Sequence, residues 1–193
     1  MIEIKLKEEN FLAKGGERTC FIHPLQAKQI IKVIHSKDKH NNQNELEYQY
    51  YKHLQQKNVD FSHIAQCHGW VETNQGKGLS FDRIIDYNGK NSKYFRFYLR
   101  NKILSEKIEQ QLLDELKLYL EKNQILFVDV STVNLFCQEI APNKFKLVIF
   151  DGLGARRLGI KFYFYLFCKV LVKYKIKKQW FKFLENYQRD KTI

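Results

Sequence analysis

One helical pattern interrupts a series of strand patterns in the first half of this 193-residue chain. Apolar residues alternate over 2–6 and form short runs at 19–22 and 29–34, as β-strands do. Two further runs, 70–73 and 79–85, flank the sequence Asn-Gln-Gly-Lys-Gly, whose glycines favour a hairpin loop. Sequential hairpins of this kind predict a small antiparallel sheet.

The interrupting pattern covers residues 44–57, between the third and fourth runs. Leu46, Tyr50 and Leu54 share one face of a helix at this spacing, and Glu47 lies near the same face. The first half is therefore predicted to be a sheet with a single inserted helix.

The second half is mainly helical. Residues 105–124 carry apolar side chains at helical spacing, with Ser105 as a candidate N-cap. A hairpin over 134–140 and 144–150 follows, and a lysine-rich helix is expected from about 160 to 185. Together the two halves predict an α+β fold.

Composition excludes several classes of protein. An apolar content of 44%, with 15 Phe and 11 Tyr, is enough for a core built around aromatic rings. The N-terminus has no apolar signal segment, and the longest apolar run, 162–172, is shorter than the roughly 20 residues that cross a bilayer. We expect a cytoplasmic protein. The cysteines stand far apart, which favours isolated thiols over a zinc site or a disulfide framework: Cys20, Cys67, Cys137 and Cys168.

The net charge of +12 is concentrated at the C-terminal end. From Arg156 onward, eleven Lys or Arg residues face only two acids, Glu185 and Asp190. Such a segment is either a solvated helix face or a surface for nucleic acid, anionic lipid or an acidic protein. We expect an exposed stripe of Lys161, Lys169, Lys173 and Lys177, with Leu166, Val170 and Leu171 buried.

Residues 127–136, Phe-Val-Asp-Val-Ser-Thr-Val-Asn-Leu-Phe, place Asp129 and Asn134 five positions apart in an otherwise apolar and hydroxylated stretch. Both residue types are common in turns, so a simple turn explains the pair taken alone. The same spacing matches the catalytic loop of protein kinases, in which the Asp orients the substrate hydroxyl and the Asn binds a metal ion.

Three further residues fit kinase roles in the expected order. Lys32 lies in the apolar run Ile-Ile-Lys-Val-Ile, as does the strand lysine that meets nucleotide phosphates, and Glu47 is its natural ionic partner, with Glu45 as the alternative. Asp151, followed by Gly152, stands where a magnesium-binding Asp-Phe-Gly motif occurs. Each has a plainer explanation: an exposed strand lysine, an exposed helix acid and a turn at a hairpin end.

The chain also departs from the kinase pattern. Its glycine-rich loop is reduced, with Ala13 at the first glycine position and Gly15 at the second. Phe127 and Val128 replace the His and Arg that precede the catalytic Asp, and Ser131 replaces a common lysine. The 42 residues after Asp151 are too few for the activation segment and large helical lobe that hold a peptide substrate.

Beyond the fold, several segments resemble the YrbL family, small bacterial proteins of the PhoP regulatory network with a kinase-like fold. They include Arg-Thr-Cys-Phe-Ile-His-Pro at 18–24, His-Gly-Trp-Val-Glu-Thr at 68–73 and Asp-Tyr-Asn-Gly-Lys at 86–90. The resemblance implies a cytoplasmic, truncated kinase-like protein with two lobes, 1–87 and 88–193. It does not supply a substrate.

Two classes of function follow. In the first, the protein is an ATP- and Mg²⁺-dependent phosphotransferase: Gly15, Lys32 and Glu47 hold ATP, Asn134 and Asp151 bind the metal, and Asp129 orients the acceptor hydroxyl. In the second, it is a pseudokinase or binding module that regulates a partner, as the reduced glycine loop favours. Nucleic-acid binding by the basic end is a weaker third alternative, because helical spacing directs most of its aromatic residues to the core.

Overall fold

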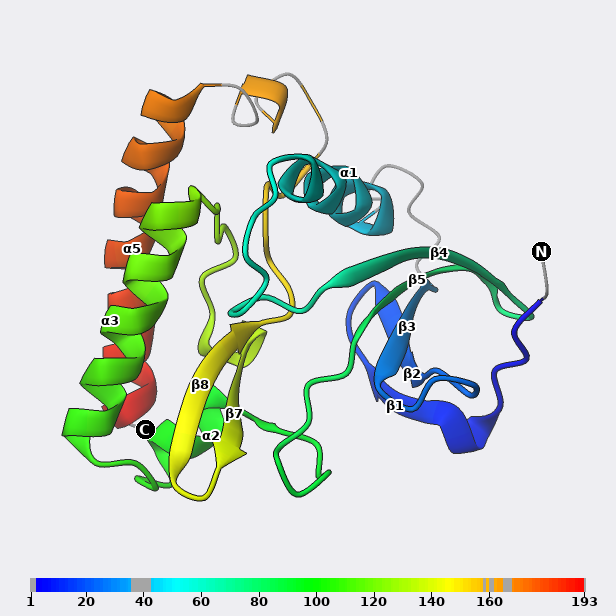
Figure 1. Cartoon of the computed structure of the whole chain (residues 1–193), viewed down its shortest axis with the longest axis horizontal. Coiled ribbons are helices and arrows are strands. Elements are labelled where there is room, and N and C mark those ends of the chain that lie inside the picture. The colour runs from blue at the N-terminus through cyan, green and yellow to red at the C-terminus, as the bar shows by residue number, and fades with distance from the viewer. Residues whose placement is uncertain (1–2, 36–42, 158, 160–161, 165–167, 193) are drawn as a thin grey trace. The chain divides into compact units, whose positions relative to one another are not determined.

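The computed structural model describes the chain in two compact units, each built around its own sheet (Figure 1). The first unit comprises Met1–Lys57 and Ala65–Arg83, and the second comprises Asn58–Ile64 and Ile84–Ile193. The described residues are 3–35, 43–157, 159, 162–164 and 168–192.

The first unit is a five-stranded antiparallel sheet with one helix. The strand order is β1-β2-β3-β5-β4, so all neighbours except β3 and β5 are consecutive in the sequence. The strands are β1 (Phe11–Lys14), β2 (Arg18–Ile22), β3 (Gln29–Ile34), β4 (Cys67–Thr73) and β5 (Gly76–Asp82). The helix α1 (Gln43–Gln56) packs on the sheet through aromatic contacts such as Tyr51 with Phe81, whose ring centroids are 5.3 Å apart. The predicted sheet with one inserted helix is confirmed.

The predicted N-terminal strand over residues 2–6 is wrong for the part that the structure describes. Ile4 forms only an isolated bridge with Thr73, and Leu6 is held by the Asn74 side chain. The Asn74 Oδ1 accepts from the Leu6 N–H at 2.7 Å, and Nδ2 donates to the Leu6 carbonyl at 3.1 Å. Because a side chain satisfies these backbone groups, no strand ladder is needed there.

The second unit combines a three-stranded sheet, ordered β6-β7-β8, with three helices whose bounds are described. Its elements are β6 (Lys93–Tyr94), α2 (Phe95–Arg100), α3 (Glu106–Asn123), a 3-10 turn (Thr132–Asn134), β7 (Leu135–Ala141), β8 (Lys144–Ile149) and α5 (Lys169–Thr192). Ser105 caps α3 as predicted, accepting from the Ile108 N–H. The sequence patterns did not reveal the short β6 and α2.

The helices α3 and α5 run side by side and enclose an aromatic core (Figure 1). Phe183 is fully buried, and its ring centroid lies 5.2 Å from that of Trp180 and 6.0 Å from that of Phe127. Phe95 stacks on Tyr187, joining α2 to the same core. The expectation of a core built around aromatic rings is confirmed in this unit.

The C-terminal helix corrects one prediction. It begins at Lys169 and ends at Thr192, so it extends beyond the predicted end near 185. Of the predicted start, residues 162–164 are also helical, and 160–161 and 165–167 lie outside the described residues. Lys169, Lys173 and Lys177 are exposed as expected, but Val170 and Leu171 are exposed too, because other residues of α5 fill the core: Val172, Ile176, Trp180, Phe183 and Tyr187. Lys161 and Leu166 lie outside the described residues. Among the helices of the described ranges, none is both long and apolar enough to span a bilayer.

The cysteines lie as free thiols, with Cys67 and Cys137 buried and Cys20 and Cys168 partly buried. Burial raises the pKa of Cys67 to about 11 and that of Cys137 further. Because the thiolate is the reactive form, these two thiols are packing residues and not nucleophiles.

Candidate functional site

In the first unit, Lys32 lies at the centre of β3 and is buried, 1% exposed. Its Nζ is 3.3 Å from Oε2 of Glu47, which projects from α1 and is 4% exposed. The Lys32 Nζ also lies 4.4 Å from the centroid of the Phe81 ring. A lysine and a glutamate withdrawn from water in this way are costly unless they are paired or used.

Glu45, the alternative partner for Lys32, accepts a hydrogen bond from Gln49 one turn further along α1, at 2.8 Å. The helix therefore presents Glu47 to the lysine. Lys32 and Glu47 are both buried, so the plainer explanations, an exposed strand lysine and an exposed helix acid, do not apply to them.

Arg18 is a further member of this cluster. Its guanidinium donates to both carboxylate oxygens of Glu47, with Nη1–Oε2 at 2.7 Å and Nη2–Oε1 at 3.2 Å. Arg18 was not predicted from the sequence, although strand periodicity points to it: positions 18 and 20 share a face of β2, and Cys20 pairs with Lys32. Two cations thus share one buried carboxylate.

Asn44, also buried, ties the start of α1 to the same place. Its Nδ2 donates to the backbone carbonyl of Lys32 at 2.8 Å, and its Oδ1 accepts from Arg18 at 3.3 Å. These bonds link α1, β2 and β3 around Glu47, so the carboxylate is held in place by secondary structure.

Gly15 lies in the tight turn between β1 and β2. Its N–H donates to the Arg18 carbonyl at 2.8 Å, and the neighbouring Lys14 and Gly16 are exposed. This turn lies between the first two strands of the sheet, where kinases have their glycine-rich loop. It is short, because β2 begins at Arg18.

In the second unit, Asp129 is exposed between two buried residues, Val128 and Val130. The Asn134 Nδ2 donates to the Asp129 carboxylate Oδ2 at 2.8 Å and to its backbone carbonyl at 2.9 Å. The loop therefore holds both side chains in one place, with the aspartate facing solvent. The other end of the Asn134 amide, Oδ1, is an oxygen of the kind that Mg²⁺ prefers.

The Asp151–Gly152 segment pairs with this loop. The Gly152 carbonyl accepts from the N–H groups of Val128 and Asp129 at 2.8 and 3.0 Å, and the Asp151 Oδ1 accepts from the Gly152 N–H. Gly152 has φ of +81°, and a Cβ there would lie 2.8 Å from the Asp129 Cβ. Only glycine allows this approach, which places Asp151 directly beside the loop of Asp129 and Asn134.

Side chains of the terminal helix α5 hold the loop of Asp129 and Asn134 through hydrogen bonds. The side chains of Gln179 and Asn186 donate to the carbonyls of Val128 and Val130, at 3.2 and 2.6 Å. Asp190 accepts from the Thr132 hydroxyl. Because positions 179, 186 and 190 lie on one side of a helix, α5 contacts every second residue of the loop.

Two partly exposed arginines pair with the buried carboxylate of Asp190. Arg96 Nε and Arg100 Nη2 donate to its two oxygens at 3.0 and 3.2 Å. Burial alone would raise the pKa of Asp190, but the hydrogen bonds from Thr132 and from the arginines lower it below its ordinary value. The carboxylate is therefore charged at neutral pH.

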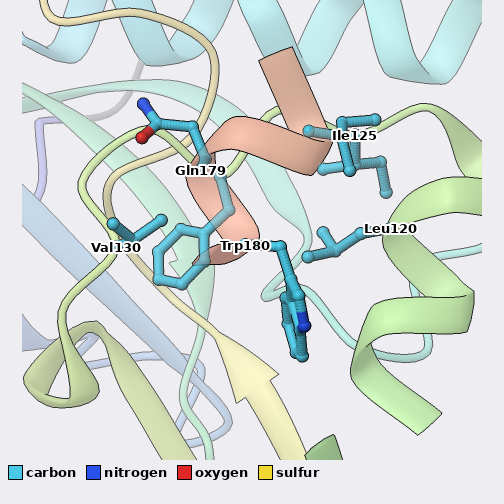
Figure 2. Close-up of a pocket in the computed structure, with 7 residues that line it drawn as sticks. Leu120, Ile125, Val130, Gln179 and Trp180 are labelled. Atoms are coloured by element: carbon cyan, nitrogen blue, oxygen red, sulfur yellow. The ribbon is translucent and has the colours of Figure 1, made fainter. Parts of the chain in front are cut away.

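Apolar residues fill the space between the loop and the two long helices (Figure 2). The cavity left there is about 10 Å³, room for no more than a single water molecule. It is lined by Leu120, Ile125, Phe127, Val130, Ile176, Gln179 and Trp180. Phe127, which stands where kinases have His, thus supports the loop by packing.

Within the described residues, no three or more His, Cys, Asp or Glu side chains form a metal-binding group. A magnesium ion held by Asp151 and Asn134 would need further oxygens from nucleotide phosphates, which is how Mg²⁺ is commonly bound in kinases. The donor set of the second unit fits that mode of binding. Lys32 and Glu47 belong to the first unit, and Asp129, Asn134 and Asp151 to the second.

Comparison with known proteins agrees with this architecture. Among solved structures, the crystal structure of Rad53 1-466 in complex with AMP-PNP matches with a TM-score of 0.56 and 16% sequence identity, over 77% of this chain and 38% of that one. This chain therefore spans less than half of that structure's length. The likeness shows that the fold is protein-kinase-like, an α+β fold as predicted.

Sequence comparison is more specific. Two relatives, each called "Uncharacterized protein YrbL", from Escherichia coli (strain K12) and Shigella flexneri, are 34% identical over 158 residues. The matches cover 80% of this chain and 75% of each relative. The family model "PhoP regulatory network protein YrbL" matches residues 4–188. The chain therefore belongs to the YrbL family of PhoP regulatory network proteins.

Proposed function

We propose that this protein is a magnesium-dependent phosphotransferase that uses ATP and acts by the protein-kinase mechanism. The observation that carries the proposal is the buried pair of Lys32 and Glu47, 3.3 Å apart. Replacing a buried ion pair by apolar residues often costs a protein nothing, so a fold does not need such a pair for its stability. A lysine fixed by an acid is what a nucleotide phosphate site requires.

The roles follow from the chemistry of each group. Lys32 contacts the α- and β-phosphates, Glu47 orients it, and the backbone at Gly15 approaches the phosphates. Asn134 and Asp151 would hold a Mg²⁺ ion, which would neutralise negative charge on the phosphates.

Asp129 accepts the proton of the acceptor hydroxyl as its oxygen attacks the γ-phosphorus, and the bond from the γ-phosphorus to ADP breaks. The exposed carboxylate of Asp129 suits a group that must meet a second substrate. The acceptor is a hydroxyl on a small molecule, a sugar or a protein. We place the reaction in the cytoplasm, where ATP is available and the thiols of this chain remain reduced.

A second candidate function is that of a pseudokinase, which binds nucleotide or a partner without turnover. Arg18, at the end of the reduced glycine loop, favours the pseudokinase, because its guanidinium donates to both carboxylate oxygens of Glu47. An arginine there adds positive charge for phosphate binding but leaves less of the Glu47 carboxylate for orienting Lys32.

Nucleotide binding is the first test. ATP with Mg²⁺ should raise the melting temperature of the full chain, since a ligand stabilises the state that binds it. Lys32→Met and Asp151→Asn should each remove most of the shift, whereas Lys52→Met, which changes an exposed lysine on α1, should retain it. Equal shifts in all of these variants would rule out the assigned site.

A further inference from the structure

The outward face of α5 carries apolar side chains that the fold does not use. Val170 is 76% exposed, Tyr174 67%, Phe181 58% and Leu171 42%. The opposite face of the same helix already supplies the core through Val172, Ile176, Trp180, Phe183 and Tyr187. Single exposed apolar residues are ordinary, but four on one helix face form a patch, and such patches mark interaction sites.

These residues form a ridge along the helix. At about 100° per residue, Val170, Phe181 and Tyr174 fall within about 40° of one another, on the side away from the buried face, and Leu171 lies about 60° further round. From Val170 to Phe181 the ridge is about 17 Å long. We call these four residues the apolar ridge of α5.

Exposed lysines flank the ridge on both sides. By the same helical geometry, Lys173 and Lys177 lie on one side of Val170, Phe181 and Tyr174, and Lys178 and Lys182 lie on the other side, the side of Leu171. Glu185 is the one exposed acid of α5, since Asp190 is buried against Arg96 and Arg100. An apolar strip between two rows of cations is the pattern of a helix that lies in a membrane interface.

We propose that the apolar ridge and its flanking lysines bind the surface of an anionic lipid bilayer. Tyr174 and Phe181 enter the boundary between headgroups and acyl chains, where amphipathic aromatic rings are favoured. The lysines meet lipid phosphates on either side, extending their apolar stems toward the ridge.

A bilayer fits this surface better than an acidic protein does. Exposed lysines lie on both sides of Val170, Tyr174 and Phe181, so a protein partner would need an apolar surface with acidic groups on both sides. An anionic bilayer offers apolar and anionic groups together. This inference does not depend on phosphotransfer, and either proposal can fail alone.

The test uses the full chain and extruded vesicles of phosphatidylcholine containing about 30% phosphatidylglycerol, with pure phosphatidylcholine for comparison. We expect co-sedimentation with the anionic vesicles at about 0.1 M salt, at least tenfold tighter than with neutral ones. No binding to anionic vesicles, or equal binding to both kinds, would overturn the proposal.

Substitutions within the ridge separate the apolar contribution to vesicle binding from the contribution of charge. The double change Tyr174→Ser and Phe181→Ser should weaken binding about tenfold or more, because it removes the buried apolar area. Leu118→Ser, at a residue of α3 that is 66% exposed, is the matched control and should bind like the parent. If the double variant also binds like the parent, the ridge does not enter the bilayer and the proposal is wrong.

The charges are tested in the same way. Lys178→Glu with Lys182→Glu should abolish most vesicle binding, whereas Lys117→Glu, on the exposed side of α3, should have a small effect. Every substituted side chain is exposed, so unchanged melting temperatures are expected and confirm that each variant folds. Retention on immobilised polyglutamate without vesicle binding would assign the surface to an acidic protein and overturn the lipid proposal.

Discussion

The Asp190 carboxylate accepts a hydrogen bond from the Thr132 hydroxyl, although the two residues are 58 positions apart in the sequence. The bond joins the last turn of α5 to the 3-10 turn that follows Asp129 and ends at Asn134. Arg96 and Arg100 pair with the same carboxylate. The end of the chain thus helps to hold the loop on which the proposed chemistry depends.

Asp190→Asn should destabilise the second unit, because it removes the charge that compensates two arginines and weakens the contact with Thr132. Both arginines are partly exposed, so we expect a loss of about 2 kcal/mol, less than for a fully buried pair. Urea denaturation measures it. Glu185→Gln, at an exposed position of the same helix, should change stability by less than about 0.5 kcal/mol. Equal effects of the two substitutions would contradict the role of Asp190.

Gly152→Ala should lower both stability and any phosphotransfer, because the new Cβ would lie 2.8 Å from the Asp129 Cβ. Gly89→Ala separates this collision from backbone strain: Gly89 has φ of +82°, against +81° at Gly152, with nothing within 4 Å of its Cβ position. Both changes carry the cost of a positive φ, about 1 kcal/mol. Thermal unfolding should show the larger loss for Gly152→Ala, and equal losses would mean that the loop can move away from position 152.

Lys32→Met and Glu47→Gln should differ in their effects on stability. Losing Lys32 leaves Glu47 paired with Arg18, and Met fills the buried space, so the free energy of unfolding should change little. Losing the Glu47 charge leaves both Lys32 and Arg18 uncompensated and should cost about 3 kcal/mol. Chemical denaturation of both variants measures these changes in the free energy of unfolding. A larger loss for Lys32→Met would indicate that the lysine is a structural residue.

Asp129→Asn separates the enzyme from the pseudokinase. If the carboxylate orients the acceptor hydroxyl, this change should leave the ATP affinity nearly intact and lower phosphoryl transfer by about 10²-fold or more. The measurement is ADP release, or transfer of labelled phosphate to lysate fractions, at saturating ATP. Asp114→Asn, at an exposed residue of α3, is the control. Equal rates in the parent and Asp129→Asn proteins would favour the pseudokinase.

Stability should fall as the pH drops below about 6.5. Burial lowers the pKa of His63, which lies against the Tyr119 ring with its Nδ1 2.8 Å from the Leu147 carbonyl. The unfolded chain binds a proton at a higher pH than the folded one, so the stabilisation is complete above the unfolded pKa and is lost below it.

Melting temperatures between about pH 7.5 and 5.5 test this prediction. His63→Gln should reduce the pH dependence without removing it, because burial also lowers the pKa values of His23 and His53. An unchanged slope in the variant would show that His63 does not contribute.

Local patterns in the sequence were sufficient for most of the elements. Short apolar runs predicted β2 and β3, helical spacing predicted α1 and α3, and two strand-like runs joined by a short turn predicted the β7–β8 hairpin. These patterns work because side-chain direction repeats along one element, whatever lies elsewhere in the chain. The order of the elements was enough to indicate the kinase-like fold.

The partners of each side chain were decided by the tertiary structure. Glu47, and not Glu45, meets Lys32 because the packing of α1 on the sheet sets the rotation of the helix. Arg18 enters the same cluster because β2 pairs with β3 in one particular register. Periodicity cannot supply this information, since contacts between distant segments depend on how elements pack.

The C-terminal helix shows the same division. Its sequence determined that it would be helical, basic and rich in apolar residues. Those apolar residues are numerous enough to cover two faces of the helix, of which only one can be buried. Contact with α3 and the Asp129 loop selected Trp180, Phe183 and Tyr187 for the core and left Val170, Tyr174 and Phe181 exposed. A helix can bury only the face that its neighbours cover, so the identity of the outward face was settled by tertiary packing alone.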